Sequence, residues 1–333
     1  MMFIDGSYGE SGGQILRTAI ALATILKKPI RITNIRKGRC NKGLRPQHLT
    51  GVKIAGEFCN AEIRGLHIGS EEIEYFPSDL KYTDKKIDIG TAGSISLLLQ
   101  GLLPILIFTD KKITIEIRGG TDGKWAPPIL YFKHVTLPVL RRMGVDAELE
   151  VLRYGFYPKG DGLVKIVFKP TENLKSINLT ERGKLKKIGG ISLVGSLPED
   201  IAERQAESAR KILKGYDVEI EKVVVKTLSP GTSMNLFAEF ENIVLGSNSL
   251  GERGKKAEMV GKEAAEEMIK SIRSYACLDK HMSDQIIPFM GLAKNSKVRV
   301  EEISQHCKTN IFVTEQLFNV KFRIDERNKI IEI

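Results

Sequence analysis

Apolar and polar positions along the chain alternate between the periods typical of helices and of strands. A mostly apolar run over residues 14–27, between Gly13 and Pro29, predicts a buried helix. Residues 30–35 alternate as in a half-buried strand. A second helix is expected over residues 46–59, followed by a short strand at 61–63. Helices and strands are therefore interleaved from the start of the chain.

The same pattern recurs further along the chain. A helix-to-strand junction at residues 49–63 resembles one at 138–149, and the glycine-rich residues 9–14 resemble 90–94. Both echoes have a spacing of roughly 80–86 residues, which indicates a repeated unit of a small sheet and two helices. A third unit is expected to begin at the strand around residues 163–168 and to end in the C-terminal stretch.

Residues 182–275 show a different pattern of expected helices and strands from the rest of the chain. An amphipathic helix is expected over 198–213, strands near 218–226 and 233–245, and a charged helix over 253–274. A segment of this length could fold alone as a small α/β domain. We therefore expect an α+β protein whose large domain, residues 1–181 and 276–333, is interrupted by an inserted domain at 182–275.

Length and composition agree with a folded protein of two domains. The 333 residues exceed the ~250–300 at which one hydrophobic core usually stops growing. The longest apolar run, residues 95–108, falls short of the ~20 residues of a membrane span. The first residues show neither the basic nor the apolar region of a secretion signal, so none is expected, and four cysteines are too few for a disulfide framework. A cytoplasmic protein without a membrane partner is expected.

The net charge of +10 belongs to one segment of the chain. Residues 11–56 contain ten basic residues and no acidic one, which leaves 41 basic and 41 acidic residues elsewhere. Within this segment, residues 36–45 mix arginines with glycines, and both residue types suit phosphate oxygens. A polyanion, either nucleic acid or a multiply phosphorylated small molecule, is the favoured partner, and a solvated basic face is the alternative.

Common nucleotide and metal motifs are missing from the sequence. It has no P-loop, no dinucleotide-binding glycine fingerprint after a strand and no His-Glu-x-x-His. Cys277 with His281, and His306 with Cys307, match no standard zinc spacing.

A set of short motifs in a fixed order resembles the RNA 3′-terminal phosphate cyclase family over nearly the whole chain. The motifs lie at residues 5–17, 35–39, 43–49, 90–100, 119–122, 126–128, 155–158, 284–285 and 306–311. The chain departs from the family at Gly160-Asp161-Gly162. It also shows no clear counterpart of the adenine-stacking phenylalanine near residues 246–251.

The resemblance implies a fold, an activity and a nucleophile. The fold is three repeats of a four-stranded sheet with two helices, plus an inserted smaller α/β domain. The activity converts an RNA 3′-phosphate to a 2′,3′-cyclic phosphate, consuming ATP and releasing AMP and pyrophosphate. His306 is expected to carry AMP covalently. We further expect Thr309 to cap a helix over residues 310–318, which would place His306 just before a helix N-terminus.

The resemblance also assigns the remaining site residues. Glu10 is expected to bind a divalent cation, Mg²⁺ or Mn²⁺, because one carboxylate with ATP oxygens and water is typical of such sites. Trp125, the only tryptophan, lies beside the pocket loop, and core packing would explain it equally well. The other expected residues are Arg17, Arg36, Arg39 and Gln47 for the RNA phosphate, and Gln100, Pro127, His281, Asp284 and Gln285 for the nucleotide.

Three other functions stay open at this stage. One is a non-catalytic, cyclase-like RNA-binding protein of ribosome assembly, against which the presence of His306 argues. The second is a metabolic enzyme related to the enolpyruvyl transferases, and the third is a general nucleic-acid scaffold. The expected partners are RNA 3′ ends and ATP, and the sequence leaves open whether the chain forms a homodimer.

Overall fold

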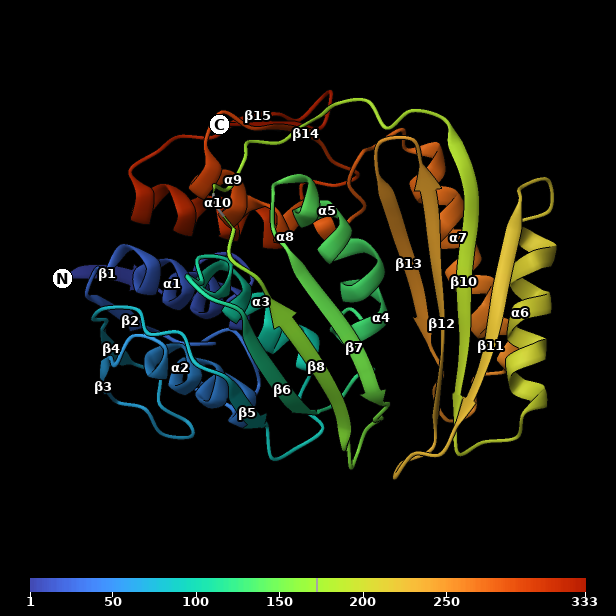
Figure 1. Cartoon of the computed structure of the whole chain (residues 1–333), viewed down its shortest axis with the longest axis horizontal. Helices are drawn as coiled ribbons and strands as arrows, with labels where there is room; N and C mark the ends of the chain where they lie inside the picture. The colour runs from blue at the N-terminus through green and yellow to red at the C-terminus, as the bar shows by residue number, and fades with distance from the viewer. Residues whose placement is uncertain (172) are drawn as a thin grey trace.

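The computed structural model describes residues 1–171 and 173–333, and it contains four four-stranded sheets with helices packed on them (Figure 1). The expected mixed α+β class is confirmed. In the described part of the chain, no helix is both long enough and apolar enough to span a bilayer.

Three of the sheets share one topology. In each, the first two strands are parallel, and the last two strands add antiparallel partners in the order first, second, fourth, third. A single helix joins the two parallel strands in the first two units. This shared order confirms the repeated α/β units that the sequence echoes predict. The first unit consists of β1 (Met2–Asp5), α1 (Gly13–Leu26), β2 (Ile30–Thr33), α2 (Pro46–Glu57), β3 (Glu62–Arg64) and β4 (Ile73–Phe76).

The second unit contains the strand with which the third unit was expected to begin. That prediction is wrong: β8 pairs along its length with β6 and β7, so it closes the second sheet. The unit consists of β5 (Lys85–Asp88), α3 (Ile95–Leu106), β6 (Ile113–Gly119), α4 (Ile129–Tyr131), η1 (Phe132–Thr136), α5 (Leu137–Arg142), β7 (Ala147–Arg153) and β8 (Gly162–Phe168).

The third unit is split by an insertion. Its first strand, β9 (Asn178–Leu179), has two residues, which is too short to show an apolar period. Its other elements all follow the insertion. They are α8 (Met282–Gln285), α9 (Ile287–Ala293), β14 (Lys297–Arg299), α10 (Gln305–Phe318), β15 (Arg323–Asp325) and β16 (Ile330–Glu332).

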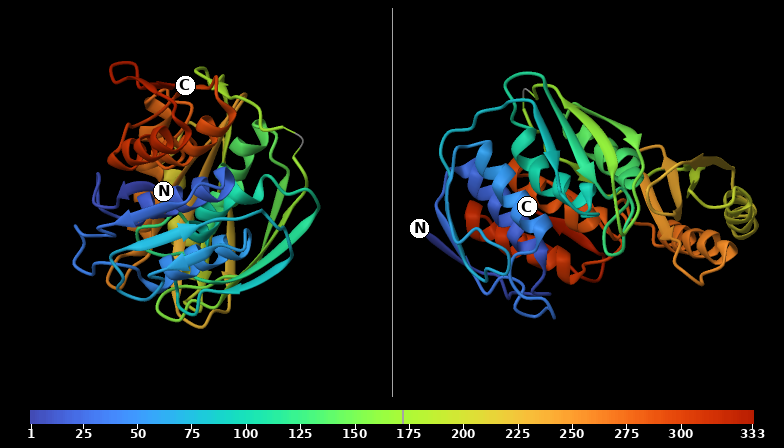
Figure 2. Two further views of the ribbon diagram at one scale, coloured as in Figure 1. Left: turned by 90° about the vertical axis from the view of Figure 1, so that its left-hand side faces the viewer. Right: turned by 90° about the horizontal axis from the view of Figure 1, so that it is seen from below.

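The inserted unit lies at one end of the molecule, as both figures of the whole chain show (Figures 1 and 2). Its sheet has the order β11-β10-β12-β13, and its two helices pack against each other. The single strand expected over residues 233–245 is two strands. We propose residues 182–275 as the bounds of a domain. Its elements are β10 (Leu185–Gly195), α6 (Asp200–Ile212), β11 (Val218–Val225), β12 (Gly231–Phe240), β13 (Val244–Leu250) and α7 (Ala257–Arg273).

Helix α1 lies at the centre of the large body. It is buried along most of its length and packs against α2, α3 and α10, so that helices of all three units meet (Figure 2). Its alanines allow this close approach because they add little volume beyond the backbone. The N-terminal segment of the chain is thereby placed against the C-terminal helix α10.

Candidate active site

His306 and Glu10 meet where the first and third units pack together. His306 lies in the first turn of α10, and Ser304 caps that helix by accepting a hydrogen bond from the Cys307 N–H at 3.2 Å. The His306 Nε2 lies 3.0 Å from Glu10 Oε2. The other ring nitrogen, Nδ1, is buried and has no hydrogen-bond partner within the described residues.

The expectation that Thr309 caps the helix is wrong. Thr309 lies inside α10, where its hydroxyl donates to the Gln305 carbonyl at 2.8 Å. His306 is therefore within the helix rather than before it. It still lies in the first turn, where the helix carries a partial positive charge that favours anions.

A glycine allows the Glu10 loop to approach α10. Gly9 has a φ of +66°, and a Cβ atom at this position would lie 2.4 Å from the Thr309 hydroxyl oxygen. A side chain here would therefore be strained and would also clash. The neighbouring Tyr8 stacks on Phe312 of α10, with ring centroids 3.9 Å apart. These contacts fix the loop, and with it the Glu10 carboxylate, against the helix.

Arg39 completes this cluster from the loop that follows β2. Its Nη2 lies 3.3 Å from the same Oε2 of Glu10 that faces His306. All three side chains keep about a third or more of their surface exposed. A phosphate could therefore reach the cluster from solvent, and we define Glu10, Arg39 and His306 as the histidine cluster.

The surroundings of His306 favour a neutral imidazole. Burial lowers its pKa below the usual value, and the positive charges of Arg17 and Arg39 lower it further, while Glu10 opposes the shift. A neutral ring has a free lone pair and can act as a nucleophile at neutral pH.

Arg17 and Asp284 lie behind this cluster. Arg17 projects from α1 and donates to the Gln14 side-chain oxygen. Burial lowers the pKa of Arg17 to about 10, so it keeps its charge at neutral pH. Burial also raises the pKa of Asp284 to about 7, against the attraction of Arg17. The two groups are thus a buried cation and a buried carboxyl whose pKa is raised toward neutral pH.

Three of the expected nucleotide and phosphate residues line one small cavity between the units. Arg17, Gln100 and Gln285 meet there, in a space of about 20 Å³, enough for one water molecule. Sequence reasoning missed Gln14, Thr18 and Asn310, which line the same cavity. Gln14 and Asn310 fall inside the family motifs, and their place in these motifs could have marked them as residues of the site.

Asn310 ties this region together. It accepts a hydrogen bond from the Thr18 hydroxyl at 2.7 Å and donates one to the Asp284 carbonyl at 2.7 Å. Gln285 accepts from the Thr136 hydroxyl at 3.0 Å. Each of the three units thus contributes a polar group to the cavity region.

Arg36 and Gln47 are engaged elsewhere. The Arg36 guanidinium donates to the carbonyls of Asn41 and Gly43, so it holds its own loop rather than the histidine cluster. The Gln47 side-chain oxygen accepts from the Ser94 N–H at 3.1 Å, which joins the start of α2 to the start of α3. Phosphate binding by these two residues stays a prediction.

His281 and Pro127 are each held by neighbours from the second unit. The carbonyl of Pro127 accepts a hydrogen bond from Ser96 at the start of α3. The His281 ring meets Tyr131 edge to face, with centroids 5.5 Å apart. Burial lowers the pKa of His281. Their roles at the nucleotide stay predictions as well.

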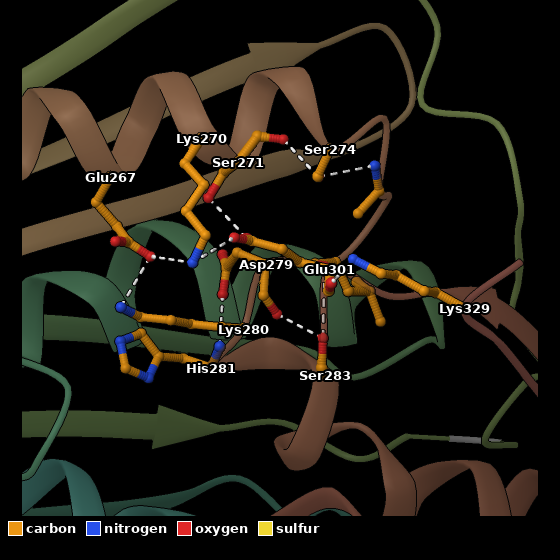
Figure 3. Close-up of polar contacts among 12 residues, drawn as sticks. Glu267, Lys270, Ser271, Ser274, Asp279, Lys280, His281, Ser283, Glu301 and Lys329 are labelled. Atoms are coloured by element: carbon orange, nitrogen blue, oxygen red, sulfur yellow. Dashed lines mark hydrogen bonds and ion pairs between the residues drawn. The ribbon is translucent and has the colours of Figure 1, made fainter. Parts of the chain in front are cut away.

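Asp279 supports His281 and was not found from the sequence. Its carboxylate accepts from the Tyr131 hydroxyl at 2.6 Å, from the N–H of His281 at 3.0 Å and from the N–H of Gly246 at 2.8 Å. Figure 3 shows this aspartate beside His281, next to the Glu267 and Glu301 side chains. No motif marks it, because its partners come from three separate units of the fold.

Trp125 does not pack in the core. Its side chain is 93% exposed, so the alternative of core packing is wrong. It lies in the loop between β6 and α4, two residues before Pro127.

Comparison with known proteins agrees with the motifs. A family model described as RNA 3′-terminal phosphate cyclase matches residues 8–324. A relative of that name from Pyrococcus furiosus is 45% identical over 97% of this chain and 95% of its own length. Relatives of the same name from Methanosarcina barkeri and Methanococcoides burtonii are 44% and 43% identical, over 100% of this chain and 99% of theirs. The chain therefore belongs to the RNA 3′-terminal phosphate cyclase family, and the predictions of this family and of an enzyme are confirmed.

Proposed function

We propose that this chain uses ATP to convert an RNA 3′-terminal phosphate into a 2′,3′-cyclic phosphate, with release of AMP and pyrophosphate. Family membership supports the overall reaction. The observation in this chain that carries the proposal is the histidine cluster, in which an accessible imidazole adjoins a carboxylate and a guanidinium. We further propose a cytoplasmic protein, as the sequence predicts.

The first step joins AMP to His306. Nδ1 is buried, so Nε2 is the nitrogen that can reach a nucleotide. In the contact with Glu10, Nε2 donates its proton to the hydrogen bond with Oε2. In the reactive tautomer the proton is on Nδ1 instead, and Nε2 turns its lone pair from Glu10 to the nucleotide. Nε2 attacks the α-phosphorus of ATP, the bond from that phosphorus to the bridging oxygen breaks, and pyrophosphate leaves. Arg39 and the first turn of α10 stabilise the negative charge that develops on the phosphate oxygens.

A divalent cation, Mg²⁺ or Mn²⁺, fits Glu10. Its Oε2 faces both His306 and Arg39, while no described residue forms a hydrogen bond with its Oε1. No cluster of three or more potential ligand side chains occurs in residues 1–171 and 173–333, so most ligands would be ATP oxygens and water, as is usual for Mg²⁺. When bound, the ion neutralises charge on the triphosphate.

Two further transfers complete the reaction. An oxygen of the RNA 3′-phosphate attacks the adenylyl phosphorus, the P–N bond breaks, and RNA(3′)pp(5′)A forms. The 2′-hydroxyl then attacks the RNA phosphorus, its proton passes to a base or water, and AMP leaves. Arg17, Arg36, Arg39 and Gln47 are proposed to hold the RNA phosphate. The proposed nucleotide residues are Gln100, Pro127, His281, Asp284 and Gln285.

Labelling with α-³²P ATP tests the first step. The protein is expected to gain an acid-labile label, and His306→Ala is expected to lose it, because the charged guanidinium of Arg39 has no free lone pair with which to replace Nε2. His67→Ala is the matched control, since His67 is an exposed histidine outside the site and should label normally. Full labelling or normal closure of RNA ends by His306→Ala would exclude this mechanism.

Removing the terminal 2′-hydroxyl tests the last step. A substrate with a 2′-deoxy terminal nucleotide is expected to accumulate as RNA(3′)pp(5′)A, because the nucleophile for ring closure is missing. Chromatography of the labelled RNA measures this product. An undiminished yield of AMP and closed RNA from the deoxy substrate would contradict the proposed order of steps.

A further inference from the structure

Two aromatic side chains project into solvent from neighbouring loops of the second unit. Trp125 is 93% exposed and Tyr157 is 77% exposed. Their loops run side by side, because Asp122 and Phe156 form a parallel bridge and the Thr121 N–H donates to the Gly155 carbonyl at 2.9 Å. Single exposed apolar residues are ordinary, but two large rings on adjacent loops are a surface that a flat partner could cover.

These loops contact the loop of residues 90–94, which precedes α3. The Gly120 N–H donates to the Gly93 carbonyl at 2.8 Å, and a Cβ at Gly160 would lie 2.8 Å from the Cα of Ala92. The loop of residues 90–94 is in turn held by Gln47, through the bond to Ser94. Gln47 and Arg17 line one cavity. A chain of contacts therefore links the loops that carry the two rings to Gln47 and Arg17, two of the proposed phosphate residues.

Each ring has a lysine close by in the sequence. The Lys124 ammonium lies 5.9 Å from the centre of the Trp125 ring and pairs with Glu252 at 2.7 Å. Lys159 is exposed, two residues after Tyr157, and forms no ion pair with any residue that the structure describes. Aromatic rings beside ammonium groups are the combination that binds single-stranded nucleic acid, since the rings stack on bases and the cations meet phosphates.

We propose that Trp125 and Tyr157 stack on the bases just upstream of the 3′-terminal nucleotide of single-stranded RNA, and that Lys159 contacts the backbone there. This inference rests on the proposed function. Two rings suit consecutive bases, whereas ATP offers a single base. A duplex end keeps its bases stacked on each other, so the platform favours single-stranded ends.

Tryptophan fluorescence tests the platform directly, because Trp125 is the only tryptophan in the chain. A single-stranded hexaribonucleotide with a 3′-phosphate is expected to quench the emission, while ATP alone and uridine 3′-monophosphate leave it unchanged. Equal quenching by ATP alone would assign the ring to the nucleotide pocket and overturn the proposal. Unchanged emission with a hexamer that the protein closes would overturn it too.

Steady-state kinetics give a second test. Trp125→Ala and Tyr157→Ala are each expected to raise the KM for the hexamer roughly fivefold or more relative to the KM for the mononucleotide, as loss of one stacked base implies. Tyr216→Ala is the matched control, an exposed tyrosine after α6 that should change neither value. Equal KM changes for both substrates would refute stacking upstream of the end.

The two proposals fail in different ways. Wild-type protein that closes no RNA ends and forms no enzyme–AMP, yet is quenched by the hexamer, refutes the proposed function and supports the platform. Normal closure of hexamer ends with unchanged KM values in Trp125→Ala and Tyr157→Ala refutes the platform alone.

Discussion

The proposed reactivity of His306 depends on the charges and the burial around its imidazole ring. Burial and the cations Arg17 and Arg39 lower its pKa, so the neutral form persists at a pH where a free imidazole, with a pKa of ~6.5, is half protonated. The rate of enzyme–AMP formation should therefore fall on acidification only below about pH 6.5. Single-turnover labelling between about pH 5 and 8 measures the midpoint of that fall.

Substitution of Arg39 tests this account. Arg39→Ala removes a positive charge that disfavours the imidazolium, so the pKa of His306 should rise and the midpoint should move to higher pH. Arg39→Lys keeps the charge and is the matched control, with a midpoint close to that of the wild type. A midpoint that stays in place in Arg39→Ala would show that Arg39 does not lower the pKa of His306.

At the scale of elements, the loop after β1 packs against helix α10, and this contact holds Glu10 beside His306. Gly9→Ala adds a Cβ to a left-handed residue and pushes it against Thr309, so Glu10 should move away from His306. We expect a loss of roughly 1–3 kcal/mol in stability and a large loss, tenfold or more, in the rate of enzyme–AMP formation. Thermal unfolding and single-turnover labelling measure the two effects.

Substitution of a second glycine distinguishes the effect of backbone strain from that of displacing the Glu10 loop. Gly215 also has a positive φ, of +100°, but nothing lies within 4 Å of a Cβ built there. Gly215→Ala should therefore lower the melting temperature by backbone strain and leave the labelling rate as it is. Equal loss of labelling in both variants would mean that the fit of Gly9 against α10 does not position Glu10.

At the scale of the whole molecule, Asp279 joins the second, third and inserted units through one buried carboxylate. Tyr131→Phe removes one hydrogen bond to a charged acceptor, which typically costs about 1.5–3 kcal/mol. Asp279→Asn should lower the stability more. The NH₂ group of the new amide would face O–H or N–H groups that donate to the carboxylate of Asp279. Melting temperatures measured by calorimetry test this order.

Ser247→Ala is the control. It removes a hydrogen bond inside the inserted unit and should lower the melting temperature less. A smaller loss in Asp279→Asn than in Tyr131→Phe would contradict the role of the carboxylate as a joint.

Sequence patterns predicted the elements that have a clear period. The helices α1 and α6 and the strand β2 lie within two residues of their expected ends. The sequence does not mark the start of α10. Three residues after its cap, Ser304, stands Cys307, where a capping box would have Glu or Gln. The two-residue strand β9 carries no period, so the third unit was placed too early.

The sequence by itself determined the family, the repeated units and the residue types of the site, because motifs and periods are local properties of the chain. Only the tertiary structure decided which side chains meet. Arg36 and Arg39 are identical in type and three residues apart, yet one binds the carbonyls of its own loop and the other faces Glu10. That difference depends on loop dihedral angles and on the packing of α10 against the first unit, and both arise from contacts between residues far apart in the chain.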